Sequence, residues 1–229
     1  MLKKEKGVYW VLEAGSTHMG KKQYVKEIIE RSKEVGADCV KFQLFDNTST
    51  YTDCGNVYMS DDLFAEAVNI GKANDIGVTA SVFSKNRLDF LVGFKVPFIK
   101  FAYSKSEFTS MIRGTLDLGH EVVVSRDVMN VWEYFDVTKS TKEKTHGKLT
   151  ILFCVPKYPV YGTLDCEAIM GTGLFDGFSD HTLGIEQTKA FAKHSKVIEK
   201  HVTLEYSDVT CPDRRFAINF DQAKKLLSV

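Results

Sequence analysis

The sequence lacks an excess of charge of either sign. Lysine plus arginine and aspartate plus glutamate each number 30 among 229 residues, so the formal net charge is zero. Proteins that bind nucleic acids or membrane surfaces usually carry a basic excess. The charge balance therefore argues against both of these functions.

Long apolar runs and paired cysteines are also missing. No apolar run reaches the roughly 18 residues that cross a bilayer, and the basic N-terminus runs into a strand-like segment, unlike a signal peptide. The cysteines are 5 in number, widely spaced and without a C-x-x-C motif. This pattern predicts free thiols in a reducing compartment, the cytoplasm. Cys39 and Cys154 lie in apolar runs and are expected to be small core residues.

No G-x-G-x-x-G motif follows any apolar run, which argues against a dinucleotide-binding sheet. The chain instead alternates apolar runs with amphipathic segments. Strands are predicted at residues 7–15, 37–45, 76–83, 97–103, 120–125, 147–155, 175–180 and 196–204. Helices are predicted at residues 21–36, 60–75, 84–94, 104–119, 163–173, 183–195 and 219–229, and segment 131–148 reads as partly helical.

Eight strands that alternate with helices, at a period near the ~30 residues of a βαβ unit, predict a parallel sheet. In a chain of this length they favour a single-domain (β/α)8 TIM barrel over residues 1–229, with an open doubly wound sheet as the alternative. Ser60 and Asn219 are the expected N-caps of their helices, and Gly36 is an expected helix end.

Polar residues follow nearly every predicted strand, at the end where such barrels carry their chemistry. They are Glu13, Lys41, Gln43, Ser81, Ser84, Lys100, Ser125, Lys157, Tyr158, Ser179, His181, Glu199 and His201. Each has a simple structural explanation when taken alone: a lysine near a strand end, a hydrogen-bonded histidine, a Glu199 paired with a base, or an adjacent Asp180 that caps a helix. Their convergence is costly unless a ligand or a metal pairs with the charges.

The residue types on this rim restrict the chemistry. Two lysines with serine hydroxyls suit a phosphate or a carboxylate. Two histidines with a nearby carboxylate suit a divalent metal ion that keeps open positions. Together they indicate activation of a carbonyl group beside a bound phosphorylated partner.

Several segments resemble motifs of the sialic acid (N-acetylneuraminate) synthase family. Segment 12–20, LEAGSTHMG, is similar to A-E-I-G-x-N-H-x-G, and segment 36–45, GADCVKFQLF, is similar to G-A-D-A-V-K-F-Q-T-F. ILFCVPKYPV, GFSDHTLGI, VIEKHVTL and the later CPD continue the match in order from about Val8 to the C-terminal end. The SDHTLGI and EKHVTL pair carries the resemblance most specifically.

The resemblance implies a metal-dependent condensation of phosphoenolpyruvate with an aldose of the N-acetylmannosamine type, with release of phosphate by C–O cleavage. It places a manganese ion, with magnesium or cobalt as alternatives, on His181 and His201. It places phosphoenolpyruvate on Lys41, Lys100, Ser125 and Ser179, with Ser81 where the family has threonine. It assigns catalytic roles to Glu13, Asp213 and His181, and it places Gln43 and Tyr158 where the two substrates meet.

The sequence departs from the family pattern at the expected acceptor side. Lys105 replaces an acid, Arg126 and Asp127 follow the fifth strand, Pro156 and Thr17 replace polar residues, and the family's small C-terminal antifreeze-like domain has no counterpart here. These changes suggest a different or more anionic acceptor. A homodimer of the barrel alone is the partner expected besides the small-molecule substrates. The alternatives are a 3-deoxy-ulosonate synthase acting on a phosphorylated aldose, a metal-dependent hydrolase or lyase, and an inactive barrel used for binding or assembly.

Overall fold

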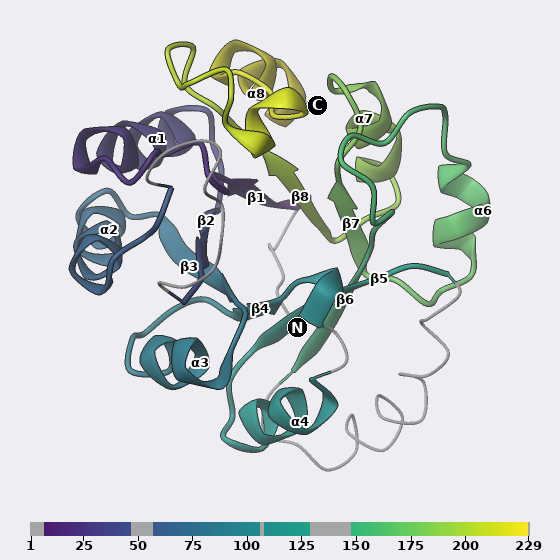
Figure 1. Ribbon diagram of the computed structural model, residues 1–229. Coiled ribbons are helices and arrows are strands. Elements are labelled where there is room, and N and C mark those ends of the chain that lie inside the picture. The colour runs from purple at the N-terminus through teal and green to yellow at the C-terminus, as the bar shows by residue number, and fades with distance from the viewer. Residues whose placement is uncertain (1–6, 47–56, 106–107, 129–147, 229) are drawn as a thin grey trace.

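The computed structural model describes residues 7–46, 57–105, 108–128 and 148–228. Eight parallel strands close into a barrel in chain order, β1 to β8, with β1 paired to β8, and the helices surround it (Figure 1). This confirms the (β/α)8 barrel and makes the open sheet wrong. The strands are β1 Tyr9–Glu13, β2 Cys39–Leu44, β3 Gly77–Val82, β4 Ile99–Phe101, β5 Val122–Arg126, β6 Leu149–Phe153, β7 Gly177–Asp180 and β8 Val197–His201.

The helices occur where the amphipathic segments predicted them. They are α1 Lys22–Glu34, α2 Asp61–Ala73, α3 Lys85–Leu91, α4 Thr109–Asp117, α6 Cys166–Gly171, α7 Glu186–Ala192 and α8 Phe220–Leu227. Residues 129–147, in the connection from β5 to β6, lie outside the described part, so the partly helical segment 131–148 stays a prediction. Within the described ranges, no helix is both long enough and apolar enough to cross a membrane.

The predicted helix ends are confirmed. The Ser60 side chain accepts a hydrogen bond from the Leu63 backbone N–H at the start of α2. Asn219 and Gln222 form a reciprocal capping box at the start of α8. Gly36 follows α1 with a φ of +89°, a left-handed conformation that favours glycine.

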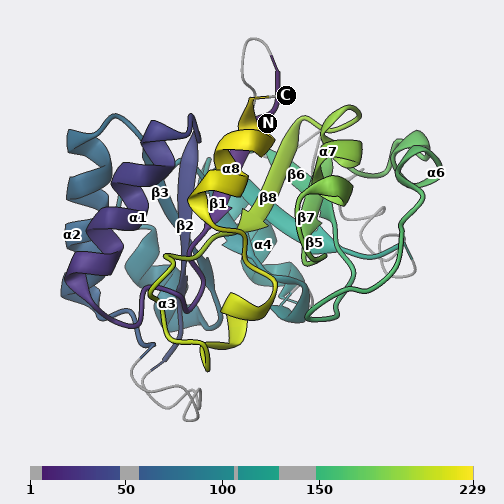
Figure 2. The same cartoon turned by 90° about the horizontal axis from the view of Figure 1, so that it is seen from above.

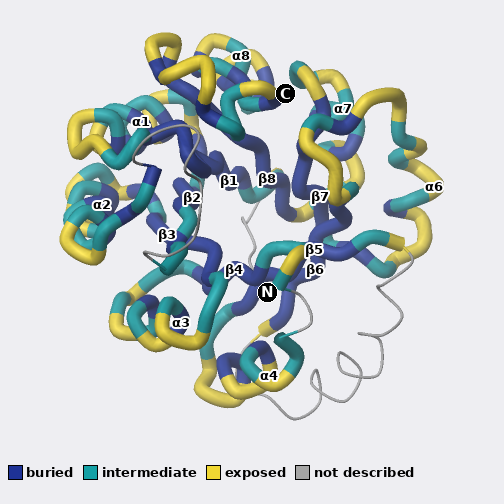
Figure 3. Tube along the Cα trace, viewed as in Figure 1, coloured by how far each residue is buried: buried dark blue, intermediate teal, exposed yellow. Residues whose placement is uncertain are grey.

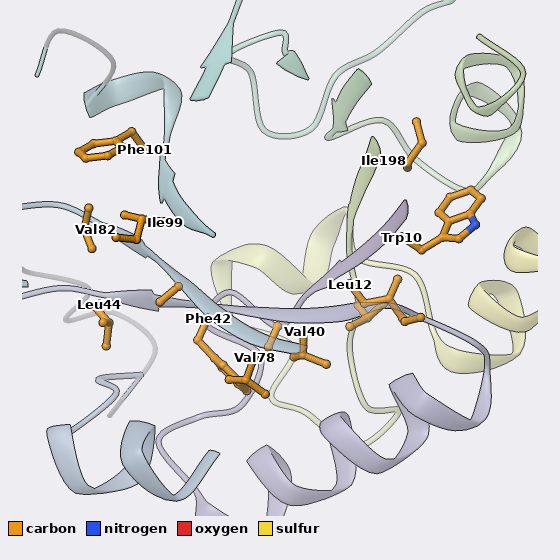
Figure 4. Packing of buried hydrophobic residues seen from close by; sticks show 14 of the residues in the cluster. Trp10, Leu12, Val40, Phe42, Leu44, Val78, Val82, Ile99, Phe101 and Ile198 are labelled. Atoms are coloured by element: carbon orange, nitrogen blue, oxygen red, sulfur yellow. The ribbon is translucent and has the colours of Figure 1, made fainter. Parts of the chain in front are cut away.

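The main hydrophobic core lies between the barrel and its helices. Outward-facing strand residues such as Trp10, Leu12, Val40 and Phe42 form part of it (Figure 4). The strands are accordingly buried, whereas the outer faces of the helices are exposed (Figure 3). Burial on both faces explains why the strands read as continuous apolar runs.

The barrel interior changes from apolar to polar along the strands. A second cluster, formed by Val11, Cys39, Phe98, Val123, Leu152 and Val197, packs separately from the outer core. Because side chains alternate along a strand, the residue two positions later faces the same side. These residues are Glu13, Lys41, Lys100, Ser125, Cys154 and Glu199, and all of them line a cavity. The apolar layer therefore forms the floor beneath a polar site.

Both described chain ends lie at one end of the barrel, and the connection from β8 to α8 extends past the other end (Figure 2). That connection carries the short 3-10 helix η4, Pro212–Arg215. The loops after the strands therefore surround the carboxyl-terminal mouth, where TIM barrels place their active sites.

We expect Gly177→Ala to destabilise the protein by about 3 kcal/mol or more, because overpacking against backbone cannot be relieved by rotating a side chain. A Cβ atom at Gly177 would lie 1.8 Å from the Val197 carbonyl oxygen and 3.1 Å from Leu152 Cδ2. Urea unfolding checks this. Gly114→Ala is the control, because its added methyl group meets nothing within 4 Å in helix α4, and it should change stability by at most about 1 kcal/mol, in the stabilising direction. Equal stability of the two variants would contradict the packing argument.

Candidate active site

A cavity of about 380 Å³ opens at the carboxyl-terminal mouth of the barrel. All eleven residues that the sequence analysis assigned to catalysis, substrate binding or metal binding line it: Glu13, Lys41, Gln43, Ser81, Lys100, Ser125, Tyr158, Ser179, His181, His201 and Asp213. The structure thus brings the whole predicted set together. Their individual roles stay predictions.

The strand register explains why residues so distant in sequence meet here. Glu13 of β1 lies opposite Lys41 of β2 on one side and His201 of β8 on the other. Ser81 of β3 lies beside both Gln43 and Lys100. Each strand therefore delivers its inward-facing polar residue to one layer of the closed barrel.

Glu13 joins three neighbouring strands through its carboxylate. Its Oε1 atom lies 2.6 Å from Lys41 Nζ and accepts a hydrogen bond from Gln43 Nε2 at 2.9 Å. Its Oε2 atom lies 3.1 Å from His201 Nε2. Burial alone would raise the pKa of Glu13, but the charges of His201 and Lys41 outweigh it and hold that pKa well below its usual range. The carboxylate is therefore ionised at neutral pH.

Glu199 is the centre of the second charged group. Lys100 Nζ donates to its two oxygens at 2.7 and 2.9 Å, and Ser179 Oγ donates at 2.7 Å. Lys41 Nζ lies 3.6 Å from Glu199 Oε2 and donates to Ser81 Oγ at 2.9 Å. Burial alone would raise the pKa of Glu199, but the Lys100 and Lys41 charges outweigh it and lower the pKa.

These contacts correct one sequence argument. The charges on the rim were expected to need a ligand or a metal as partner, yet Lys41 and Lys100 pair with Glu13 and Glu199. The expectation that Glu199 pairs with a base is confirmed. Acid–base pairing inside the barrel lets both lysines be only 1% exposed without a bound ligand.

Ser125 Oγ stands apart from these networks. It is buried in the cavity wall and has no hydrogen-bond partner among the described residues. A buried hydroxyl without a partner carries a desolvation cost. The Ser125 side chain is therefore a donor available to a ligand.

His181 follows β7 and His201 ends the neighbouring β8, and their ring centroids lie 5.5 Å apart. Burial and the neighbouring His201 lower the pKa of His181 to about 4, so this imidazole is neutral near pH 7. Burial alone would lower the pKa of His201, but Glu13 outweighs it and raises the pKa. His201 Nδ1 is a buried atom without a hydrogen-bond partner among the described residues.

Asp213 reaches the same corner from η4. Its Oδ2 atom accepts hydrogen bonds from both the backbone N–H and the hydroxyl of Ser16, each at 2.6 Å. A Cβ atom at Gly15, whose φ is +51°, would lie 2.4 Å from Asp213 Oδ2 and 3.1 Å from His201 Nδ1. Only a glycine therefore leaves room for the loop after β1 to pass this close to both side chains.

Among the residues that the structure describes, no three His, Cys, Asp or Glu side chains group together to hold a metal ion. A metal on His181 and His201 would therefore take its further ligands from substrate and water. The neutral His181 and the unpartnered Nδ1 atom of His201 are suitable donors for such an open site.

Ser84, Lys157 and Asp180, which the sequence analysis also named, do not line the cavity. Ser84 caps helix α3 by accepting from the Arg87 N–H, and Lys157 is exposed and does not line the cavity. Asp180 accepts hydrogen bonds from the Thr182 N–H, the Thr188 hydroxyl and Lys200 Nζ, so it ties β7 to β8 and α7.

Cys154 is buried as predicted, but it also lines the cavity, where its Sγ atom lies 3.7 Å from His181 Nδ1. Burial raises the pKa of this thiol to about 12, so it is protonated near pH 7. The apolar run around Cys154 gave no signal of this contact with the site.

The two basic departures do not line the cavity. Lys105 Nζ lies over the Phe108 ring, 5.2 Å from its centroid. Arg126 lies beside Phe153 in the ladder, on the outward side of β5, because its neighbour Ser125 faces inward. The cavity therefore does not support the prediction that Lys105 and Arg126 contact an anionic acceptor.

The sequence analysis missed an aromatic wall and one cation at the mouth. Phe45, Phe83, Tyr103, Phe216 and Arg215 line the cavity in addition to Tyr158. Their only sequence signal is position, since each follows a strand by a few residues or lies in the CPD segment. Aromatic residues in loops are too common for that signal to identify a site.

Comparison with known proteins decides the family. The model of the NeuB family matches residues 28–229.

This chain belongs to the NeuB family.

Two curated relatives illustrate the range of the NeuB family. The chain is 24% identical to the N-acetylneuraminate-9-phosphate synthase of Drosophila melanogaster, over 87% of this chain and 61% of that protein. It is 27% identical to the N,N'-diacetyllegionaminic acid synthase of Legionella pneumophila, over 95% of this chain and 69% of that protein. The chain thus spans only about three fifths of the Drosophila relative.

The fold of this chain also matches that of a solved structure. The crystal structure of N-acetylneuraminic acid (sialic acid) synthetase from Leptospira borgpetersenii superposes with a TM-score of 0.84 at 22% identity, covering 97% of this chain and 82% of that one. At this identity the likeness supports the barrel fold.

Proposed function

We propose that this chain is a phosphoenolpyruvate-condensing synthase that joins phosphoenolpyruvate to the aldehyde of a sugar. The proposal rests on the layer of lysines and hydroxyls just above the apolar floor of the cavity, in a chain that belongs to the NeuB family. Lys41 and Lys100 supply charge, and Ser125 supplies an unpartnered hydroxyl. A phosphate and a carboxylate on one small molecule suit this layer. The synthase names of the relatives agree with this proposal.

The reaction balances with water as the third reactant. Carbon 3 of phosphoenolpyruvate attacks the aldehyde carbon, forming the new C–C bond, and the aldehyde oxygen takes up a proton. Water adds to carbon 2 and loses its protons, and the C–O bond to phosphate breaks. The products are a 2-keto sugar acid and inorganic phosphate.

In the proposed reaction, Glu13 accepts the proton that the attacking water loses. It is the ionised carboxylate at the cavity wall, and its hydrogen bonds to Gln43 and its contact with His201 fix its orientation. Asp213, which accepts hydrogen bonds from Ser16, assists from the neighbouring loop after β8. Gln43 and Tyr158 line the space where the two substrates meet. In this arrangement Glu13 acts as general base and Asp213 orients the water.

A divalent ion, manganese first and magnesium or cobalt as alternatives, fits His181 and His201. When bound, it would polarise the aldehyde carbonyl. The fit rests on the neutral imidazole of His181 and on the buried, unpartnered Nδ1 atom of His201, which would bind the ion once that nitrogen has lost its proton. Phe216 packs against both imidazoles, with its ring centroid 4.8 Å from that of His201 and 5.7 Å from that of His181.

Ser125→Ala is expected to weaken phosphoenolpyruvate binding without weakening the fold. Loss of a hydrogen bond to a charged group lowers affinity by about 10- to 100-fold. Stability should change by less than about 0.5 kcal/mol, because Ser125 Oγ has no partner to lose among the described residues. Isothermal titration of phosphoenolpyruvate, with manganese present, and thermal unfolding measure the two effects.

Ser179→Ala is the matched comparison. Ser179 Oγ donates to Glu199, so its removal should cost about 1.5–3 kcal/mol of stability. Absence of phosphoenolpyruvate binding to the folded wild-type protein would overturn the proposed function and favour an inactive barrel used for binding. Equal affinity of wild type and Ser125→Ala would remove Ser125 from the site.

A further inference from the structure

Arg215 is the cavity-lining cation that the acid–base network does not use. Among the described residues, the lysines and arginines that line the cavity are Lys41, Lys100 and Arg215, and the two lysines pair with Glu13 and Glu199. The Arg215 guanidinium donates from Nε to the Pro212 carbonyl oxygen at 3.4 Å, and no carboxylate of the described residues pairs with it. Its side chain therefore retains charge and donors for a ligand.

The backbone that carries Arg215 is held firmly beside the mouth. Asp213, two residues earlier, is bound to Ser16 at 2.6 Å, and the preceding Arg214 donates to the backbone oxygens of Ser207 and Glu205. Phe216, the next residue, is buried with its ring 4.8 Å from the His201 ring centroid. Anchors on both sides reduce the conformational entropy that ligand binding would cost.

Several of the other residues that line the cavity are aromatic. The rings of Phe45 and Phe83 stack with centroids 4.2 Å apart, and the Tyr158 ring centroid lies 4.3 Å from that of His181. The Tyr103 hydroxyl donates to Asp127 at 2.9 Å and is thereby occupied. Such walls contact the carbon skeleton of a ligand and exclude water, which strengthens any charged contact in the mouth.

We propose that Arg215 binds an anionic substituent of the second substrate, so the acceptor is an aldehyde that carries a phosphate or a carboxylate group. This inference rests on the proposed function. Phosphoenolpyruvate is matched to the floor by Lys41, Lys100 and Ser125, which leaves the cation at the mouth for the other reactant. A guanidinium binds either anion through two parallel hydrogen bonds.

The test compares three acceptors that share one skeleton: N-acetylmannosamine, its terminal phosphate monoester and its uronic acid. Phosphate release that depends on phosphoenolpyruvate is measured at saturating phosphoenolpyruvate. For wild type, we expect one anionic acceptor to have a kcat/KM at least about tenfold above the neutral sugar. In Arg215→Met the KM for that anionic acceptor should rise about 10- to 100-fold. The KM for the neutral sugar should stay unchanged. The anionic acceptor with the higher kcat/KM shows whether the site prefers a phosphate or a carboxylate group.

Two further variants sharpen the result. Arg215→Lys should recover part of the affinity, because a point charge remains without the planar fork. Lys157→Met removes an exposed positive charge on the loop after β6 that does not line the cavity, and it should leave all three acceptors unchanged. An equal effect of Lys157→Met and Arg215→Met on the KM of the anionic acceptor would show that only the overall positive charge near the mouth matters. That result would overturn the proposal.

Titration of phosphoenolpyruvate into wild type and Arg215→Met separates this inference from the proposed function. Equal affinity is expected. A loss of affinity in Arg215→Met would move the arginine to the phosphoenolpyruvate site and overturn its acceptor role. Preference of wild type for the neutral sugar, or no turnover of any of the three, would also overturn it. In those cases retained phosphoenolpyruvate binding leaves the proposed function standing, and its absence removes both.

Discussion

Glu13→Gln is expected to lower the turnover number by about 10²- to 10⁴-fold, the range for loss of a positioned general base. The amide keeps the size of the side chain and can still accept from Gln43, but it cannot take a proton from water. Lys41 retains Glu199 at 3.6 Å as a counter-ion, so the cavity charge stays partly balanced. Phosphate release under saturating substrates measures turnover, and calorimetry measures phosphoenolpyruvate binding, which should persist.

Glu121→Gln is the control for this carboxylate-to-amide change. Glu121 lies just before β5, at the end of the barrel away from the cavity, and pairs with Lys148 at 3.8 Å. Neither turnover nor binding should respond to it. Unchanged turnover in Glu13→Gln would rule out its role as the base. Joint loss of turnover and phosphoenolpyruvate binding would instead make Glu13 part of the binding layer.

Lys100→Met is expected to cost about 3–5 kcal/mol of unfolding free energy at pH 7, because it leaves a buried carboxylate without its main partner. Glu199 then keeps Ser179 and the more distant Lys41. Urea unfolding followed by circular dichroism measures the loss. Lys100→Met/Glu199→Gln should recover part of it, since no uncompensated carboxylate remains.

The pH dependence of this loss has a definite sign. In the folded wild type the pKa of Glu199 is lowered, because the Lys100 and Lys41 charges outweigh its burial. Its contribution to stability is therefore present above the unfolded value of about 4.3 and disappears as pH falls through the lower folded value. Without Lys100, burial raises the pKa of Glu199 again. The difference between the two proteins should narrow on acidification, first as pH falls through the raised Glu199 pKa of Lys100→Met and then, below about pH 4.3, as wild type loses the Glu199 contribution.

Lys148→Met provides the surface comparison, because the Lys148 side chain is 66% exposed in its pair with Glu121. Such exposed pairs contribute at most about 1 kcal/mol. A loss in Lys100→Met as small as that of Lys148→Met would show that the buried pair is well solvated. A difference that widens at low pH would contradict the sign argument for Glu199.

The strand pattern illustrates how far local sequence determines this protein. Segments 37–45 and 196–204 are apolar runs interrupted by Lys41, Glu199 and His201 at alternate positions. In a strand buried on both faces, that alternation places Lys41, Glu199 and His201 on the inner side. Lys200, between the last two, faces outward and pairs with Asp180. Fold class and the inward-facing polar residues of the strands follow from this periodicity, because it needs only neighbours within one element.

The pairing of the buried charges could not be predicted from this local pattern. Which carboxylate meets which lysine depends on the register of β1, β2 and β8 in a closed barrel, where Glu13 lies between Lys41 and His201. The outward position of Arg126 and the position of the exposed Arg215 beside the cavity were likewise decided by strand ends and loop paths. Local composition says little about either.

The sequence alone thus determined that a polar layer forms at the mouth of a (β/α)8 barrel, because side-chain alternation and strand order are local properties. The tertiary structure alone decided how that layer is neutralised, which hydroxyl is left unpartnered and which cation faces the mouth. These depend on distances of a few ångströms between residues such as Lys100 and Glu199, which are 99 positions apart in the chain. Only closure of the barrel brings such residues within reach of one another.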